Sequence, residues 1–310
     1  KNLCLAGGVA LNCVTNGILL REEIFDKIWI QPASGDAGGA LGAALSGWYL
    51  HYNNKRKVIS NSDSMKGSYL GPSFSDDEIE IALNSCGAVY KKLSYKQLIE
   101  MSALALADEK ALGWMQGRME FGPRALGARS ILGDPRSDKM QKNLNLKVKY
   151  RESFRPFAPS VLREDLSKWF DINVDSPYML LVANILPSKK IQMNDEQKKL
   201  FGIDKLNIKR SEIPAVTHVD YSARVQTVTK ETNNRYYDLI SKFKEKTGCA
   251  VIVNTSFNVR GEPIVNTPTD AFNCFMGTEL DYLVIGNCIL EKSKQNPNLK
   301  KDYTKEFELD

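Results

Sequence analysis

The apolar positions at the start of the chain change their spacing from one short segment to the next, and each change predicts a new element. An apolar strand at 1–5 runs into a glycine turn, and the spacing over 11–21 is that of a helix. A brief apolar run at 28–30 predicts a second strand, and a helix rich in Ala and Gly follows at 37–49. We therefore expect residues 1–52 to form a β-α-β-α unit, the end of an α/β domain.

Residues 53–66 are polar and turn-rich and predict a linker. From 67 to 292 helical spacing alternates with short apolar runs, which predicts an α/β fold of the mixed α+β kind, a twisted open sheet with flanking helices. The lysine-rich stretch 187–213 predicts a long excursion or lid, and 293–310 a charged, frayed tail. Helices are expected at 75–85, 94–108, 137–146, 164–170, 235–247 and 269–277, and strands at 111–115, 157–162, 179–183, 215–219, 223–228, 250–254 and 282–285.

Composition narrows the class of protein. The chain has 310 residues, 43% of them hydrophobic and 25% charged, which is an ordinary globular balance with room for two domains. No apolar run is long enough to span a membrane. Six cysteines without a CxxC pair are typical of buried thiols in a reducing compartment, so we expect a cytoplasmic protein. Because the chain begins without Met and without a signal peptide, we expect it to be part of a longer protein.

The formal charge of +5 is unevenly distributed. Residues 110–163 contain twelve Lys and Arg against four Asp and Glu, a local surplus of +8, so the remainder sums to −3. A concentrated surplus favours a discrete anion site over a surface that binds nucleic acid throughout. The alternative interpretation is a solvated basic face.

Part of this surplus lies in a segment rich in Gly and Pro, 118–136, which reads RMEFGPRALGARSILGDPR. Guanidinium groups match phosphate and carboxylate oxygens, and glycine lets the backbone approach a ligand closely. Arg124 and Arg129 are five residues apart, and we expect them to face one pocket from a turn and a following helix. We expect Arg118 and Arg136 to be structural partners.

Two further segments supply candidate groups for the same site. Lys149 and Arg155 follow closely, Arg155 in a proline-locked extended stretch, whereas Lys147 and Arg151 could equally be solvated. The apolar run 250–254 ends in neutral hydrogen-bonding side chains, where α/β sheets commonly bind ligands, although an ordinary turn is the alternative. Arg224, on an apolar strand, needs a partner or a ligand. The neutral groups are Asn254, Ser256 and Asn258.

The first unit carries two weaker signals. Gly7 and Gly8 stand between a strand and a helix, where backbone N–H groups can face an anion, and Asn12 can hydrogen-bond a ribose or base. A plain turn is the alternative. Asp36 is flanked by glycines at a helix start, where an acid is either a metal ligand or an N-cap.

Taken together, these segments resemble the O-carbamoyltransferase family, which includes nodulation carbamoyltransferases and the tobramycin and cephamycin tailoring enzymes. The resemblance follows the family's order along almost the whole chain. It is carried by AGGVALN (6–12), QPASGDAGGALGAAL (31–45), GRMEFGPRALGARSILGDPR (117–136), FRPFAPSVL (154–162), ARVQTV (223–228) and NTSFNVRGEPIV (254–265).

The resemblance implies two domains. Residues 1–52 would be the end of an actin-like, ATPase-type domain that transfers the carbamoyl group, and 67–292 a YrdC-like domain that makes carbamoyladenylate from carbamoyl phosphate and ATP. It implies ATP and Mg²⁺ in the second domain and Fe²⁺ in the first. Asp36 would be a metal ligand, and Gly7, Gly8 and Asn12 would face a nucleotide. Carbamoyl phosphate and ATP would be bound by Arg124, Arg129, Lys149, Arg155, Arg224, Asn254, Ser256 and Asn258.

The family's histidine metal ligands lie on an upstream helix that this chain lacks, and neither His51 nor His218 stands in that context. Asp36 alone would hold a metal weakly. The competing enzyme interpretation is a threonylcarbamoyl-adenylate synthase acting in tRNA modification. A third is an RNA-binding module that stacks bases on aromatic side chains such as Tyr150, Phe154 and Phe157. The acceptor hydroxyl is not identified by the sequence, and a homodimer is left open.

Overall fold

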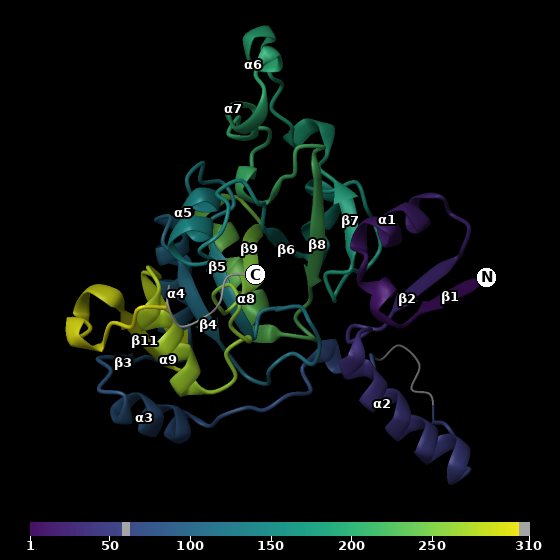
Figure 1. The fold of residues 1–310 in the computed structure, drawn as a ribbon, viewed down its shortest axis with the longest axis horizontal. Coiled ribbons are helices and arrows are strands. Elements are labelled where there is room, and N and C mark those ends of the chain that lie inside the picture. Colours follow the sequence, from purple (N-terminus) through teal and green to yellow (C-terminus); the bar gives the residue numbers. More distant parts are fainter. Residues whose placement is uncertain (58–62, 304–310) are drawn as a thin grey trace.

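The computed structural model describes residues 1–57 and 63–303 (Figure 1). Residues 58–62 of the expected linker and 304–310 of the expected tail lie outside the described residues. Within them the chain forms two sheets, one of two strands and one of nine. No described helix is both long and apolar enough to cross a membrane.

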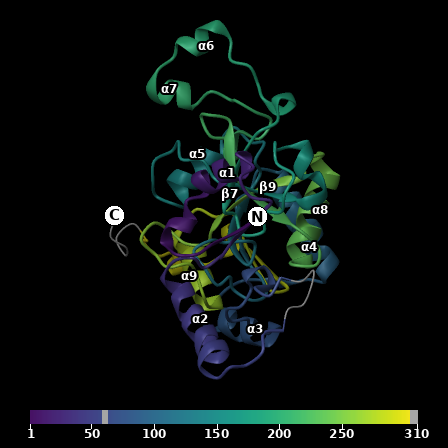
Figure 2. The same ribbon diagram turned by 90° about the vertical axis from the view of Figure 1, so that its right-hand side faces the viewer.

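The N-terminal unit has the predicted β-α-β-α order. Its two strands, β1 (Asn2–Leu5) and β2 (Lys27–Ile30), are parallel, as a strand–helix–strand crossover requires. α1 (Cys13–Arg21) makes the crossover, and its first turn is capped by the Asn12 side chain, which accepts from Thr15 N. α2 (Asp36–Ser46) follows β2 and projects from the rest of the molecule (Figures 1 and 2).

The nine-stranded sheet is mixed. Two pairs of neighbouring strands are parallel, Tyr282–Ile285 with Leu112–Met115 and Ala158–Leu162 with Ser222–Val228. The other neighbouring strands are antiparallel. The fold class expected from the sequence, a mixed α/β sheet flanked by helices, is confirmed. The strand order is β3 (Lys91–Lys92), β11 (Cys288–Glu291), β10 (Tyr282–Ile285), β4 (Leu112–Met115), β5 (Arg129–Gly133), β9 (Val251–Ser256), β6 (Ala158–Leu162), β8 (Ser222–Val228) and β7 (Leu181–Asn184).

Local sequence signals set the ends of the helices within residues 63–303. The longest begins after the cap Asn233 and ends at Gly248, which adopts the left-handed conformation with φ 75°. Ser75 and Ser94 each open a helix through a capping box. The helices are α3 (Asp76–Ser85), α4 (Tyr95–Ala107), α5 (Met140–Lys147), α6 (Asp195–Lys199), α7 (Gly202–Leu206), α8 (Asn234–Thr247) and α9 (Pro268–Gly277).

The N-terminal unit packs against the edge strand β7. Asn16 of α1 is buried and donates to the carbonyl of Leu180 at 3.1 Å, and Arg21 donates to that of Val182 at 3.2 Å. At Gly17 a Cβ would lie 2.4 Å from the same Val182 oxygen, so the close approach of helix and strand requires glycine. This contact brings the N-terminus of α1 beside β8.

Several local predictions differ from the structure. Residues 215–219, expected as a strand, contain a 3₁₀ turn at Pro214–Val216, because proline cannot donate to a ladder. The tail is packed at least to Tyr303, whose ring is buried against Gly277. The excursion 187–213 carries α6 and α7 away from the sheet (Figure 1, top), as the polar composition predicts.

Gly127, between β4 and β5, supplies a test of the packing. Its φ is +105°, and a Cβ there would lie 2.4 Å from the ring of Tyr236 on α8. We expect Gly127→Ala to lower the free energy of unfolding by about 2–4 kcal/mol, through overpacking and backbone strain. Gly39→Ala, in α2 with nothing within 4 Å, is the matched control and is expected to be neutral or stabilising by up to about 1 kcal/mol. Urea unfolding measures both, and equal effects would contradict the packing described.

Candidate functional site

Guanidinium groups from three separate segments gather near one end of the neighbouring strands β5, β9, β6 and β8 of the large sheet. Arg224 lies on β8, Arg124 in the loop between β4 and β5, and Arg151 and Arg155 in the segment that follows α5. Burial, together with the neighbouring charges of Arg124 and Arg155, lowers the pKa of Arg224 to about 10. Burial and the charges of Arg155 and Arg224 likewise lower the pKa of Arg151 to about 10. Arg224 therefore lies within electrostatic range of the other three cations.

Two of these guanidinium groups are incompletely paired. The Nε atoms of Arg124 and Arg224 are both buried, and neither has a hydrogen-bond partner in the described part of the chain. Arg124 makes one long bond, 3.5 Å from Nη2 to the carbonyl oxygen of Leu11. The Cys13 thiol, at the first residue of α1, lies close to both groups. Buried, mutually repelling donors of this kind are stabilised by an anion with several oxygens.

Arg151 belongs to this cluster, although the sequence left it open as a solvated residue. Its Nε donates to the side-chain oxygen of Asn145 at 2.7 Å, and its guanidinium lies 5.0 Å from the centre of the Phe157 ring. Lys149 and Arg151 are two residues apart in the KYR triplet, shortly after the basic residue Lys147. That spacing was the available signal.

Lys149 is buried and lies at the carboxyl end of β9. Its Nζ lies within hydrogen-bond distance of four oxygens. Two belong to Ser256, the carbonyl at 2.5 Å and the hydroxyl at 3.2 Å, and two to Asn258, the carbonyl and the side-chain oxygen, both at 2.8 Å. Burial, with a further contribution from the charge of Arg151, lowers the pKa of Lys149 to about 7. The structure thus brings Lys149, Ser256 and Asn258 together, as the sequence led us to expect.

Arg129 and Asn254 are placed differently from the expectation. No helix follows Arg124; Arg129 begins β5 and its guanidinium is fully buried, bonded to the carbonyls of residues 116, 117, 128 and 72. Asn254 is 1% exposed and donates to the Ala125 carbonyl at 3.1 Å. Both side chains lie beneath the loop that carries Arg124 instead of beside its guanidinium.

The candidates in the N-terminal unit are open to solvent. Gly7 and Gly8 would each meet nothing within 4 Å if a Cβ were added, and Gly7 has φ +91°. Asn12 caps α1, which supports the structural interpretation of that residue. Asp36 opens α2 and is exposed, and the described residues hold no group of three His, Cys, Asp or Glu side chains suited to a metal ion. Asp36 alone does not make up an iron site.

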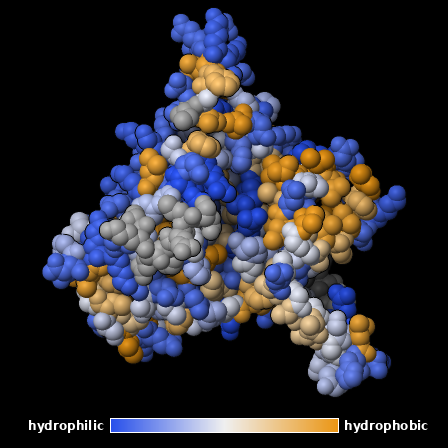
Figure 3. Space-filling view, viewed as in Figure 1, coloured by the Kyte–Doolittle hydropathy of each residue, from blue (hydrophilic) through white to orange (hydrophobic). Residues whose placement is uncertain are grey.

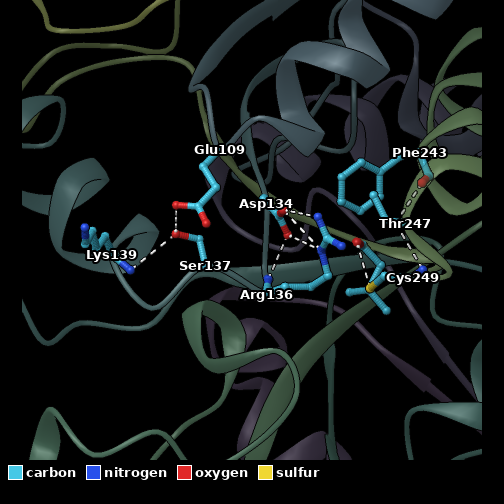
Figure 4. A network of polar contacts seen from close by, with 9 residues as sticks. Glu109, Asp134, Arg136, Ser137, Lys139, Phe243, Thr247 and Cys249 are labelled. Atoms are coloured by element: carbon cyan, nitrogen blue, oxygen red, sulfur yellow. Dashed lines mark hydrogen bonds and ion pairs between the residues drawn. The ribbon is translucent and has the colours of Figure 1, made fainter.

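Arg118 and Arg136 have the structural partners that the sequence predicted. Arg118 donates to the carbonyl of Gly71 at 2.9 Å. Arg136 forms an ion pair with the buried carboxylate of Asp134 at 2.6 Å and lies over the Phe243 ring, 5.4 Å from its centre (Figure 4). Figure 4 shows this network near the end of α8, around Thr247 and Cys249, and it contains none of the four clustered arginines.

The surface of the N-terminal unit is hydrophobic, whereas the surface between it and the large sheet is hydrophilic. Figure 3 shows a hydrophobic patch over α1 and β2 and hydrophilic side chains between it and the body of the molecule. The exposed apolar residues of this unit include Val14, Ile18 and Trp29. A separate hollow of about 590 Å³ lies at the ends of β4 and β10, lined by Gln116, Arg118 and Arg235 among others.

Comparison with known proteins identifies the chain's relatives. The family model described as Carbamoyltransferase C-terminus matches residues 103–292, and that described as Carbamoyltransferase N-terminus matches residues 1–45. The chain belongs to the carbamoyltransferase family. This confirms the resemblance found in the sequence.

Relatives of this chain occur in bacteria and archaea. The chain is 58% identical to an uncharacterized protein of Synechocystis over its whole length and 40% identical to Nodulation protein NolNO of Sinorhizobium fredii over 96% of it. An uncharacterized protein of Methanocaldococcus jannaschii is 35% identical over 94% of the chain. The chain covers 51%, 41% and 44% of these proteins, so it spans about half the length of the relatives it matches.

Among solved structures, full-length HypF in its phosphate- and nucleotide-bound form is similar over 59% of this chain and 20% of its own, with a TM-score of 0.35 and 17% identity.

Proposed function

We propose that the arginine cluster binds the phosphate groups of carbamoyl phosphate and ATP, and that the protein forms carbamoyladenylate. The observation that supports this most strongly is that the buried Nε–H groups of Arg124 and Arg224 have no hydrogen-bond partner among the described residues, while Arg151 and Arg155 lie close to Arg224. A phosphate supplies several acceptor oxygens and negative charge at once, which is what two repelling guanidinium forks require.

In the proposed reaction, water cleaves carbamoyl phosphate to carbamate and phosphate. A carbamate oxygen then attacks the α-phosphorus of ATP, and the bond to the β-phosphate oxygen breaks to release pyrophosphate. The clustered cations would neutralise the charge that develops on the phosphoryl oxygens, and Ser256 and Asn258 would orient the carbamate. ATP would enter as its Mg²⁺ complex. Transfer to an acceptor hydroxyl would also need the region that the relatives possess beyond this chain's length, and no step is assigned to Asp36.

The aromatic residues argue against the RNA-binding alternative. Tyr150 is partly buried and its hydroxyl donates to the carbonyl of Gly277 at 2.8 Å, while Phe157 is buried beneath Arg151. Of the three rings considered for stacking, only Phe154 is exposed. A module that binds single strands needs accessible faces for successive bases.

The experiment that tests the proposal is ATP–pyrophosphate exchange catalysed by the 310-residue chain. We expect exchange with Mg²⁺ and carbamoyl phosphate, and none with threonine and bicarbonate. Exchange with threonine and bicarbonate instead would favour the threonylcarbamoyl-adenylate alternative. The absence of exchange with either pair would overturn the proposed adenylate chemistry.

A further inference from the structure

The loop that carries Arg124 has an unusual internal structure. Residues 117–128 connect β4 to β5 without forming a helix or strand, yet many of their backbone groups are bonded to other parts of the chain. Met119 exchanges backbone hydrogen bonds with residues 71 and 72, and Phe121 is bonded to Ser68 through both its N–H and its carbonyl. An irregular loop is held in one conformation only when its buried polar groups are satisfied in this way.

Glu120 organises the loop from within. Its side chain is 6% exposed, and one carboxylate oxygen accepts from the N–H groups of Leu126 at 2.6 Å, Ala128 at 2.7 Å and Arg129 at 3.4 Å. A carboxylate that accepts several backbone N–H groups forms charge-assisted hydrogen bonds, which are stronger than neutral ones. Glu120 therefore fixes the residues that immediately follow Arg124.

The face of the sheet holds the same loop from below. Gln226 of β8 and Ser160 of β6 are register partners, and Asn254 of β9 lies on the same side of the sheet. Gln226 donates to the Leu126 carbonyl at 2.8 Å, and Asn254 to the Ala125 carbonyl at 3.1 Å. The three side chains are also bonded to one another, Ser160 and Asn254 both donating to the Gln226 side-chain oxygen at 2.6 and 2.8 Å.

The tip of the loop contrasts with this framework. N–H groups of the residues after the tip are bound by Glu120, and the carbonyls of Ala125 and Leu126 are bound by the sheet. Within the described part of the chain, Arg124, one residue earlier, has only its long bond to Leu11, and its buried Nε has no partner. The hydrogen bonds of Glu120, Gln226 and Asn254 thus hold the backbone next to Arg124 but leave its guanidinium free to bind an external ligand.

We propose that Glu120 and the sheet-face group Ser160, Gln226 and Asn254 are positioning residues that hold Arg124 in place to bind a phosphate. This inference rests on the proposed function of the cluster. It assigns Asn254 a role beneath the loop in place of direct contact with the carbamoyl group. Arg129, which bonds carbonyls at both ends of the loop, has the same role.

A double-mutant cycle on the 310-residue chain tests the proposal, with inorganic phosphate as the probe. The variants are Glu120→Gln, Arg124→Ala and the two combined, and the affinity is measured from the phosphate-dependent shift in unfolding temperature, at concentrations that saturate the weakest variant. If Glu120 acts through Arg124, Glu120→Gln weakens binding by about tenfold in the parent chain and by less than about twofold beside Arg124→Ala. Glu245→Gln, an exposed acid paired with Lys242 on α8, is the matched control and should leave the affinity unchanged.

Stability alone cannot imitate this result, because a general loss of stability lowers the unfolding temperature without phosphate equally in both backgrounds. If Glu120→Gln does not fold, Gln226→Leu, which removes the bond to the Leu126 carbonyl, takes its place in the cycle with the same expectation. Equal losses of affinity in both backgrounds, or no loss in either, would overturn the positioning role. Unchanged phosphate affinity in Arg124→Ala by itself would instead remove Arg124 from the proposed site and overturn both proposals.

Discussion

Replacing Arg224 by alanine is expected to reduce carbamoyl-phosphate-dependent ATP–pyrophosphate exchange by about 10²–10³-fold, the effect of removing one donor that stabilises developing charge. Arg224 lies on β8, which is paired on both sides with β6 and β7. Because this strand is held rigidly, we expect no other cation of the site to take the place of Arg224. Its guanidinium is mostly buried and its Nε has no hydrogen-bond partner among the described residues, so we expect it to depend on the anion for that bond.

Two controls separate this effect from a loss of folding or of charge alone. Arg163→Ala removes an arginine paired with Asp175, outside the four-arginine cluster, and should leave the exchange rate within about twofold, as for an exposed surface ion pair. Arg224→Lys keeps the charge but loses the planar fork, so we expect a rate between those of the parent chain and Arg224→Ala. An exchange rate in Arg224→Ala equal to that of the Arg163→Ala control would show that β8 does not contribute to the site.

Phosphate binding is expected to take up a proton at Lys149. Burial lowers the pKa of this ammonium group to about 7, so near neutral pH it is partly deprotonated in the free protein. A bound anion favours the charged form, and we therefore expect phosphate affinity to fall by up to about tenfold per pH unit as the pH rises above 7. Calorimetry in two buffers of different ionisation enthalpy at pH 7.5 measures the proton uptake directly.

The same group has a defined effect on stability. Its pKa is lower in the folded chain, about 7, than its usual 10.5, so between these values the unfolded chain binds more protons. Below pH 7 the burial of charged Lys149 therefore lowers the free energy of unfolding by its full amount. As the pH rises from 7 towards 10.5, the free energy of unfolding increases again. Lys149→Met should abolish both this dependence and the proton uptake. Proton uptake that persists in Lys149→Met would assign it to another group.

Much of the site could be predicted from the sequence because its members follow clear local signals. Arg124 stands in a Gly- and Pro-rich turn, Ser256 and Asn258 follow a continuous apolar strand, and Arg224 is a cation on an apolar strand. Each pattern indicates a residue type that needs a partner or a ligand. The structure brings these residues to one edge of the sheet through pairings between strands that are distant in the chain.

The remaining members could not be predicted because their role depends on strand register. Asn254 was expected to contact a ligand. In the sheet its register partner on β6 is Ala158, and the loop that carries Arg124 lies over this pair of strands. The Asn254 amide therefore donates to the Ala125 carbonyl of that loop. Arg129 appeared equivalent to Arg124 in sequence, yet it begins β5 and is fully buried. Only the three-dimensional path of the loop distinguishes the partly buried Arg124 from the fully buried Arg129.

The most direct test of the central claim is a crystal structure of the chain soaked with ATP, Mg²⁺ and carbamoyl phosphate. We predict electron density for a phosphate group between Arg124 and Arg224, within hydrogen-bond distance of both Nε atoms, and for the carbamoyl end beside Ser256. Density for the ligands elsewhere, for example in the hollow at the ends of β4 and β10, with Arg124 and Arg224 unliganded, would contradict the account.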